Sequence, residues 1–227
     1  MLAQFVPAAL ALLLAAGGLS WRMERFHQAE GQARWIVPRG DVVRAIATDF
    51  ENLLADSFWL QFLQYNGEKL TEDPLERRYE NLLNGFYLMT DLDPHFRDAY
   101  LFGSWVLGDA GEADGAVALL RRGRERHPAD PWYAHQLGYI EFLYRRNLAG
   151  AIAAFGDAER LFGQGERQDP RMALRCAKMK AYLAEKHDRR DLAVRTWRGI
   201  LASARKAGDK HMVGIAENAL RRLGVTE

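Results

Sequence analysis

Residues 94–127 read PHFRDAYLFGSWVLGDAGEADGAVALLRRGRERH, and residues 128–161 read PADPWYAHQLGYIEFLYRRNLAGAIAAFGDAERL. The two segments share a spacing of prolines and small residues. Pro94 and Pro128 lie 34 residues apart, and Gly103 with Gly138 and Ala116 with Ala151 lie 35 residues apart. A period of this length is typical of chains in which pairs of helices stack one after another.

The repeated residues have a direct packing role. A glycine in the first helix of a pair, such as Gly103, lets the second helix approach closely, and an alanine such as Ala116 fits the same contact. A large residue four positions later, Leu120 or Phe155, is expected to fill the core between pairs. A proline then ends the pair, because it lacks an amide hydrogen and restricts the residue before it.

The hydrophobic pattern predicts helices from residue 41 onward and shows no convincing strand alternation. We expect four helix pairs and a capping helix, at 41–66 with 75–92, 95–109 with 112–127, 130–145 with 148–162, 170–186 with 189–207, and 209–223. In the fourth pair, Ala177, Ala193 and Trp197 take the places of the small and large residues. Gly224, after two arginines, is typical of a helix end.

The first of these helices is expected to be amphipathic. Its apolar residues recur at intervals of three and four: Val42, Ala45, Ile46, Phe50, Leu53, Leu54, Phe58, Leu60, Phe62 and Leu63. Such spacing places apolar side chains on the helix face that packs against the rest of the domain.

Residues 94–162 resemble the tetratricopeptide repeat family, and 41–93 and 170–207 resemble it more loosely. Residues 52–65 and 88–107 are similar to bacterial membrane-anchored or exported proteins of that family. Each clear repeat has one extra residue between the first-helix glycine and the turn, and Gly115 and Gly123 weaken one helix. The resemblance implies an all-α, right-handed α-solenoid that binds and scaffolds proteins and has no chemistry of its own.

In that fold the first helix of each pair lines a concave groove. The repeat directs these residues toward it: Arg97, Tyr100, Ser104, Trp132, His135, Tyr139, Arg171, Leu174 and Lys178. Tryptophan and tyrosine dominate binding hot spots, because they bury much area at a small entropic cost. The arginines and the lysine are suited to holding an acidic tail or a C-terminal carboxylate. Packing between repeats is the alternative role for each residue.

The N-terminal residues 2–21, LAQFVPAALALLLAAGGLSW, carry no charge. A helix of that length spans about 30 Å, the thickness of the hydrocarbon core of a bilayer. We therefore expect a transmembrane anchor in residues 1–22, a juxtamembrane linker in 23–40 and the helical domain in 41–227. Trp21 suits the membrane interface, and Gly17 and Gly18 allow close packing of a neighbouring helix.

The location of the domain follows from the flanking charges. Five arginines follow the apolar segment, at positions 22, 25, 34, 39 and 44, and the positive-inside rule then favours a cytoplasmic domain at the bacterial inner membrane. A cleaved signal peptide is the alternative, with the small residues at 16–18 as its cleavage site. That alternative predicts an exported periplasmic binding module.

Charge is balanced in total but uneven along the chain. The 227 residues hold 31 Lys+Arg and 30 Asp+Glu, a balance that gives no general attraction for nucleic acid. Residues 41–120 hold 5 basic and 15 acidic side chains, whereas residues 168–227 hold 14 and 7. The basic end is therefore suited to an acidic partner or to anionic lipid.

Motifs that carry chemistry are absent from the sequence. The six histidines show no metal-ligand spacing, and we find no phosphate-binding glycine loop and no nucleophile elbow. Cys176, the one cysteine, is expected to be a small buried residue. We therefore expect no enzyme activity, no cofactor and no metal. The sequence predicts a membrane-anchored interaction scaffold, either an accessory subunit or an assembly factor of a bacterial membrane complex.

Overall fold

The structure is a computed structural model that describes residues 35, 37–38, 40–72, 79–164 and 168–225. Every regular element in these ranges is a helix, and they contain no strand. The predicted all-α class is therefore confirmed. The elements in chain order are α2 (Gly40–Ala47), a 3-10 turn η2 (Thr48–Phe50), α3 (Glu51–Leu70), α4 (Leu82–Leu92), α5 (Arg97–Asp109), α6 (Ala113–Arg126), α7 (Pro131–Leu143), α8 (Leu148–Gln164), α9 (Pro170–Lys186), α10 (Arg190–Ala207) and α11 (Lys210–Arg222).

The predicted helix bounds hold best where the repeat is clearest. From α5 to α11 each predicted end lies within two residues of the observed end. Aspartates at 130 and 169 cap α7 and α9 through backbone amides, and each is followed by a proline whose fixed φ suits a first helical position. At the other end of the domain, Gly208 and Gly224 end α10 and α11 with φ of +70° and +72°.

The N-terminal helices differ from the prediction. The expected single helix 41–66 is interrupted by η2, where Phe50 leaves helical geometry at φ −114° and ψ 21°. Asp49 directly precedes this break, and aspartate competes with the helix because its side chain hydrogen-bonds to nearby backbone groups in non-helical conformations. Helix α4 begins at Leu82, after Asn81 in the left-handed conformation, and not at 75; residues 73–78 lie outside the described ranges.

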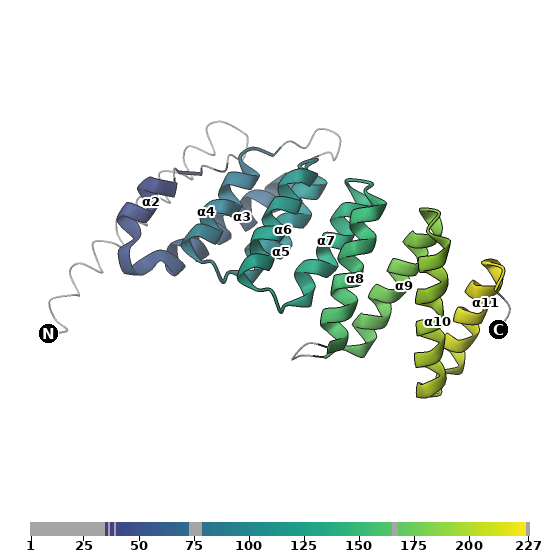
Figure 1. Ribbon diagram of the computed structural model, residues 1–227. Coiled ribbons are helices and arrows are strands. Elements are labelled where there is room, and N and C mark those ends of the chain that lie inside the picture. The colour runs from purple at the N-terminus through teal and green to yellow at the C-terminus, as the bar shows by residue number, and fades with distance from the viewer. Residues whose placement is uncertain (1–34, 36, 39, 73–78, 165–167, 226–227) are drawn as a thin grey trace, which may run out of the picture.

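Helices that follow one another in sequence also lie side by side in space (Figure 1). Contacts also skip one helix, because α5 touches α7 and α4 touches α6. Three ion pairs join residues about one repeat apart, at separations of 31 to 33 positions: Arg122 with Asp91, Arg124 with Asp157, and Arg97 with Asp130. These contacts arrange the helices as a row of packed neighbours, with α2 and α11 at its two ends.

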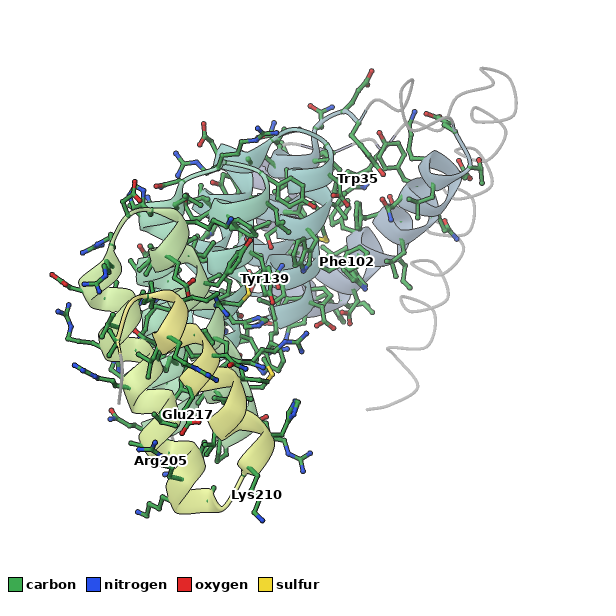
Figure 2. The ribbon with its side chains drawn as sticks, turned by 90° about the vertical axis from the view of Figure 1, so that its right-hand side faces the viewer. Trp35, Phe102, Tyr139, Arg205, Lys210 and Glu217 are labelled. Carbon is green, nitrogen blue, oxygen red and sulfur yellow. The ribbon has the colours of Figure 1, made fainter. Side chains whose placement is uncertain are left out.

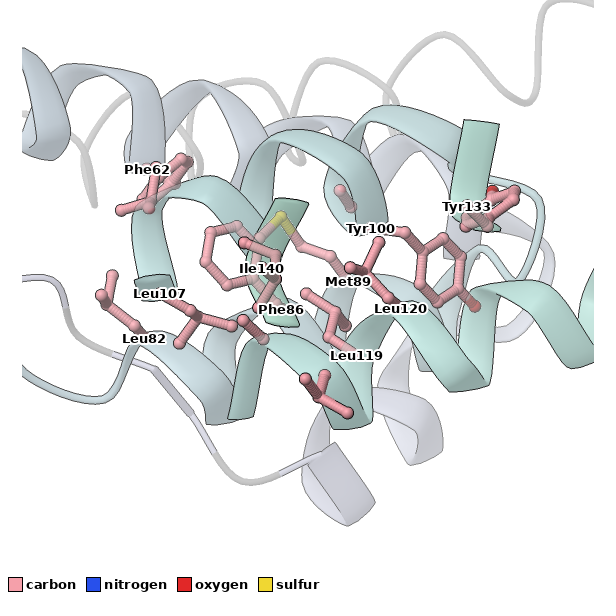
Figure 3. Close-up of a cluster of buried hydrophobic side chains, with 14 of the residues drawn as sticks. Phe62, Leu82, Phe86, Met89, Tyr100, Leu107, Leu119, Leu120, Tyr133 and Ile140 are labelled. Atoms are coloured by element: carbon pink, nitrogen blue, oxygen red, sulfur yellow. The ribbon is translucent and has the colours of Figure 1, made fainter. Parts of the chain in front are cut away.

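One apolar core runs through the first helices of the row. Figure 3 shows Phe62, Phe86, Tyr100 and Tyr133 among the leucines of this cluster. The small and large residues that the repeat places in the core are all buried: Ala116, Leu120, Ala151, Phe155, Ala177, Ala193 and Trp197. The prediction that these residues lie in the core is therefore confirmed.

Two glycines show how the repeat works. An ideal Cβ on Gly138 would lie 2.9 Å from the ring of Phe155, so this glycine admits the second helix of its own pair, as predicted. On Gly103 the Cβ would lie 2.7 Å from the ring of Phe86, which belongs to the preceding helix α4. The atoms nearest to this position therefore belong to the preceding helix and not to the following helix, which was the predicted partner of Gly103.

We expect Gly103→Ala to lower the free energy of unfolding by about 1–3 kcal/mol, because the added methyl forces the buried ring of Phe86 to move. Gly214→Ala is the matched control, since no atom lies within 4 Å of its Cβ position. That change should raise stability by up to about 1 kcal/mol through helix propensity. Urea unfolding measures both, and equal effects would contradict the packing role of Gly103.

The predicted apolar face of the first helix is only partly buried. Phe62 and Ala55 lie in the core, but Leu53, Leu60 and Leu63 are exposed, with fractions of 62%, 61% and 38%. The expectation that these three leucines belong to a core-facing surface is therefore wrong. The α3 residues that pack inward occupy one side of the helix. Leu53 and Leu60 lie on the opposite side, and Leu63, which follows the buried Phe62, lies between the two sides.

No helix within the described ranges combines the length and the apolar character that crossing a bilayer requires. The predicted anchor, with Gly17, Gly18 and Trp21, lies outside these ranges. Among the described residues of the predicted linker 23–40, Trp35 belongs to the core. Trp35 is 5% exposed, and its ring lies 5.1 Å from that of Phe62 and 6.0 Å from that of Phe86.

Candidate functional site

Two of the predicted groove residues lie in the interior. Tyr100 and Ser104 are both 0% exposed. The Tyr100 hydroxyl donates to the carbonyl of Pro94 at 3.3 Å, whereas the Ser104 hydroxyl donates to the carbonyl of Leu101 at 2.8 Å and accepts from Gln136 at 2.5 Å. Both residues therefore join α5 to its neighbours, and their predicted place at the groove surface is wrong.

The other predicted residues reach the surface to different extents. Trp132 is 40% exposed, and Arg97 and Arg171 are exposed as well. Arg97 is already paired, because its Nε lies 2.8 Å from Oδ2 of Asp130. The remaining four, His135, Tyr139, Leu174 and Lys178, are half-buried.

Three of these residues belong to a longer row of rings. We define the aromatic row as Trp59 of α3, Phe102 and Trp105 of α5, and Tyr139, His135 and Trp132 of α7. Its ring centroids are separated by 5.7 Å (Trp59 to Phe102), 6.2 Å (Trp105 to Tyr139), 5.0 Å (Tyr139 to His135) and 5.3 Å (His135 to Trp132). Phe102 and Trp105 are three positions apart on one helix, which joins the two halves of the row.

The aromatic row lies in the middle of the molecule. Figure 2 shows Phe102 and Tyr139 between Trp35 near one end and Arg205 and Lys210 at the other. Trp59, Phe102 and Trp105 were not predicted as site residues. A signal for one of them was present, since Trp105 and Tyr139 lie 34 residues apart, one repeat period.

His135 is the imidazole of the aromatic row. Its Nε2 atom is buried and has no hydrogen-bond partner among the described residues. Burial lowers the pKa of His135 to about 4, and the positive charge of Arg175 adds to this effect. The ring is therefore neutral at pH 7, so this part of the surface offers apolar contact area rather than charge.

The lowered pKa of His135 predicts a pH-dependent stability. The unfolded chain, with an ordinary histidine pKa near 6.5, binds more protons than the folded chain. The stability that depends on a neutral His135 is therefore fully present above about pH 6.5, and it is lost as the pH falls toward 4. Between pH 7 and pH 4.5, wild type should lose about 2 kcal/mol more stability than His135→Leu. Parallel pH profiles of the two proteins in urea unfolding would refute this expectation.

Cationic side chains follow the aromatic row on the next first helix. Arg171, Arg175 and Lys178 lie along α9 at helical spacing, and we call them the cationic stripe. Tyr182 continues this side of α9 and is 46% exposed, with the Lys186 ammonium 5.8 Å from its ring. Arg175 is the member of the cationic stripe whose charge acts on the pKa of His135.

The described residues show a surface for contact and charge. Cys176 is buried, as predicted, and burial raises the pKa of its thiol to about 12. Within the described ranges, no three His, Cys, Asp or Glu side chains gather as a metal site would require. Comparison with known protein families found no family model that matches this chain, and comparison with curated proteins found no match.

Proposed function

We propose that the chain is a membrane-anchored interaction scaffold built as a tetratricopeptide-like, right-handed α-solenoid. In this proposal it is an accessory subunit or assembly factor of a bacterial membrane protein complex. The observation that carries the proposal is the aromatic row, which crosses three successive first helices and leaves Phe102 and Trp132 each 40% exposed. The ion pairs between residues about one repeat apart support the solenoid arrangement.

The aromatic row and the cationic stripe suit one kind of partner. Rings such as Trp132 and Phe102 bury large apolar areas when a partner covers them, and they lose few rotamers in doing so. The three cations of α9 add charge-assisted hydrogen bonds to carboxylates. The favoured ligand is therefore a segment with apolar side chains next to acidic residues or a free C-terminal carboxylate.

The anchor in this proposal is the uncharged segment 2–21, with Trp21 at the interface and Gly17 and Gly18 in contact with helices of the partner complex. The arginines that follow it favour the cytoplasmic side of the inner membrane. Protease accessibility in inverted and right-side-out vesicles tests the side.

Partner capture tests the proposed function. We expect the double change Phe102→Ala and Trp132→Ala to reduce partner recovery from native membranes about tenfold, because both rings lie at the surface of the aromatic row. The melting temperature should fall by no more than about 8 °C, because neither ring is buried and each should contribute about 1 kcal/mol or less. Leu143→Ala, at a 50% exposed leucine outside the row, should leave recovery unchanged.

The readout is quantitative mass spectrometry of proteins that co-purify with full-length chain in mild detergent. Full recovery with the double variant, or a native chain that recovers no membrane partner, would refute the proposed function.

A further inference from the structure

Helix α3 carries apolar residues on two sides. Its inner side buries Ala55 and Phe62. Its outer side presents Leu53 and Leu60, with Leu63 at its edge, and the three are 62%, 61% and 38% exposed. We call these three the leucine face. A helix that is apolar on both sides is typical of one that is covered on both sides.

Among the described residues of η2 and α3, the exposed charges all have one sign. Asp49, Glu51, Asp56 and Glu68 are exposed along η2 and α3. Lys69, the one basic residue between positions 49 and 72, is buried and bound to Glu72 at 2.8 Å. Two leucine faces packed on each other would bring these carboxylates together without a cation between them. A covering surface of opposite charge is favoured instead.

The same chain has such a surface near its other end. A cleft of about 600 Å³ lies between α8 and α10 over α9, and its walls include Gly163, Ala173, Ala177, Leu192, Gly199 and Ile200. These small and aliphatic side chains leave room for leucines, and no atom lies within 4 Å of the Cβ position of Gly199. Its charged lining residues are Arg195, which is exposed, and the ion pair between Lys180 and Glu159, so the cleft has one cation beyond that pair.

We propose that a second copy of this chain covers the leucine face, with Leu53, Leu60 and Leu63 of one copy seated in the α8–α10 cleft of the other. Figure 1 places α3 and helices α8 to α10 toward opposite ends of the row, so the contact joins one end of one copy to the other end of a second copy. Residues 41–120, with a net charge of −10, then face residues 168–227, with a net charge of +7.

Cross-linking tests the arrangement. Cys176, the one cysteine of the native sequence, is buried, and burial raises the pKa of its thiol. It should therefore react little with the cross-linker, and the background of cross-linked dimer should be low. Full-length chains with Leu60→Cys and with Ser203→Cys, carrying different tags, are mixed in mild detergent and treated with a short bismaleimide. Ser203 lines the cleft, and we expect a cross-linked dimer that contains both tags. Ala118→Cys, an exposed position on α6, is the matched control and should give only background.

Sedimentation equilibrium of the full chain gives the second measurement. We expect a dimer whose dissociation constant rises about tenfold or more with Leu53→Ser and Leu60→Ser together, and rises further at high salt. Circular dichroism melts show that this variant stays folded. A monomer at every concentration, as when residues 2–21 cover the leucine face within one copy, would overturn the proposal. So would a dimer unaffected by these changes. A monomer that still captures a membrane partner would overturn this inference alone and leave the proposed function standing.

Discussion

Replacement of Phe155 by alanine is expected to lower the free energy of unfolding by about 3–5 kcal/mol, the range for a fully buried phenylalanine that leaves a cavity. Phe155 is 0% exposed, and its ring faces Gly138 at a distance no side chain there would allow. The ring also lies 5.1 Å from that of Tyr139 and 6.2 Å from that of His135. The ring of Phe155 therefore packs beneath the Tyr139 and His135 rings of the aromatic row and fills the contact between α7 and α8.

Two controls separate the cavity from a general loss of aromatic area. Phe155→Leu keeps most of the volume and should lose less than half as much stability. Phe102→Ala removes the same side chain from a position that is 40% exposed and should lose about 1 kcal/mol or less. The measurement is urea unfolding followed by circular dichroism. A loss for Phe155→Ala no larger than that for Phe102→Ala would show that the α7–α8 contact is not closed by this ring.

The sequence predicted the helices of the repeat well, because the determinants of a helix pair are local. Ala116 and Ala151 fix which side of each second helix is buried, and aspartate followed by proline marks where α7 and α9 begin. The sequence did not predict the break at η2, because the apolar spacing continues through it although the backbone at Phe50 is not helical.

The surface was harder to predict than the core. Ser104 and Trp105 are neighbours on α5, yet one is buried by Gln136 from α7 and the other joins the aromatic row. The repeat period gives the direction of a side chain only to within about one position, or 100° of rotation. Whether a side chain pointing in that direction is buried depends on how closely the next helix approaches, and the repeat period does not give the distance between helices.

The leucine face shows the same limit in another form. Leu53 and Leu60 fit an apolar pattern at intervals of three and four, so the sequence assigns them to a core. Within the described part of the chain, α4 and Trp35 pack on the side of α3 that carries Phe62, while Leu53 and Leu60 stay exposed. An apolar pattern predicts that side chains are buried, but it does not say whether the covering surface belongs to the same chain or to a second copy.

Replacement of Trp35 by alanine is expected to lower the free energy of unfolding by about 3–5 kcal/mol, although Trp35 lies in a segment whose sequence indicates a linker. The indole is 5% exposed and packs on Phe62, Tyr65 and Phe86 with centroid distances of 5.1, 6.1 and 6.0 Å. An ideal Cβ on Gly85 would lie 1.9 Å from the indole, so α4 has a glycine where the indole rests.

Trp132→Ala is the matched control, because it removes the same side chain from a position that is 40% exposed. It should change stability by about 1 kcal/mol or less, as read from urea unfolding of the full-length chain. If the two tryptophan variants lost equal stability, Trp35 would not belong to the core. If Trp35→Ala has the larger effect, the helical domain begins before α2, and at most 13 residues separate its first core residue from Trp21 of the proposed anchor. At about 3.5 Å per residue, that segment holds the α2–α3 end of the domain within about 45 Å of the membrane interface.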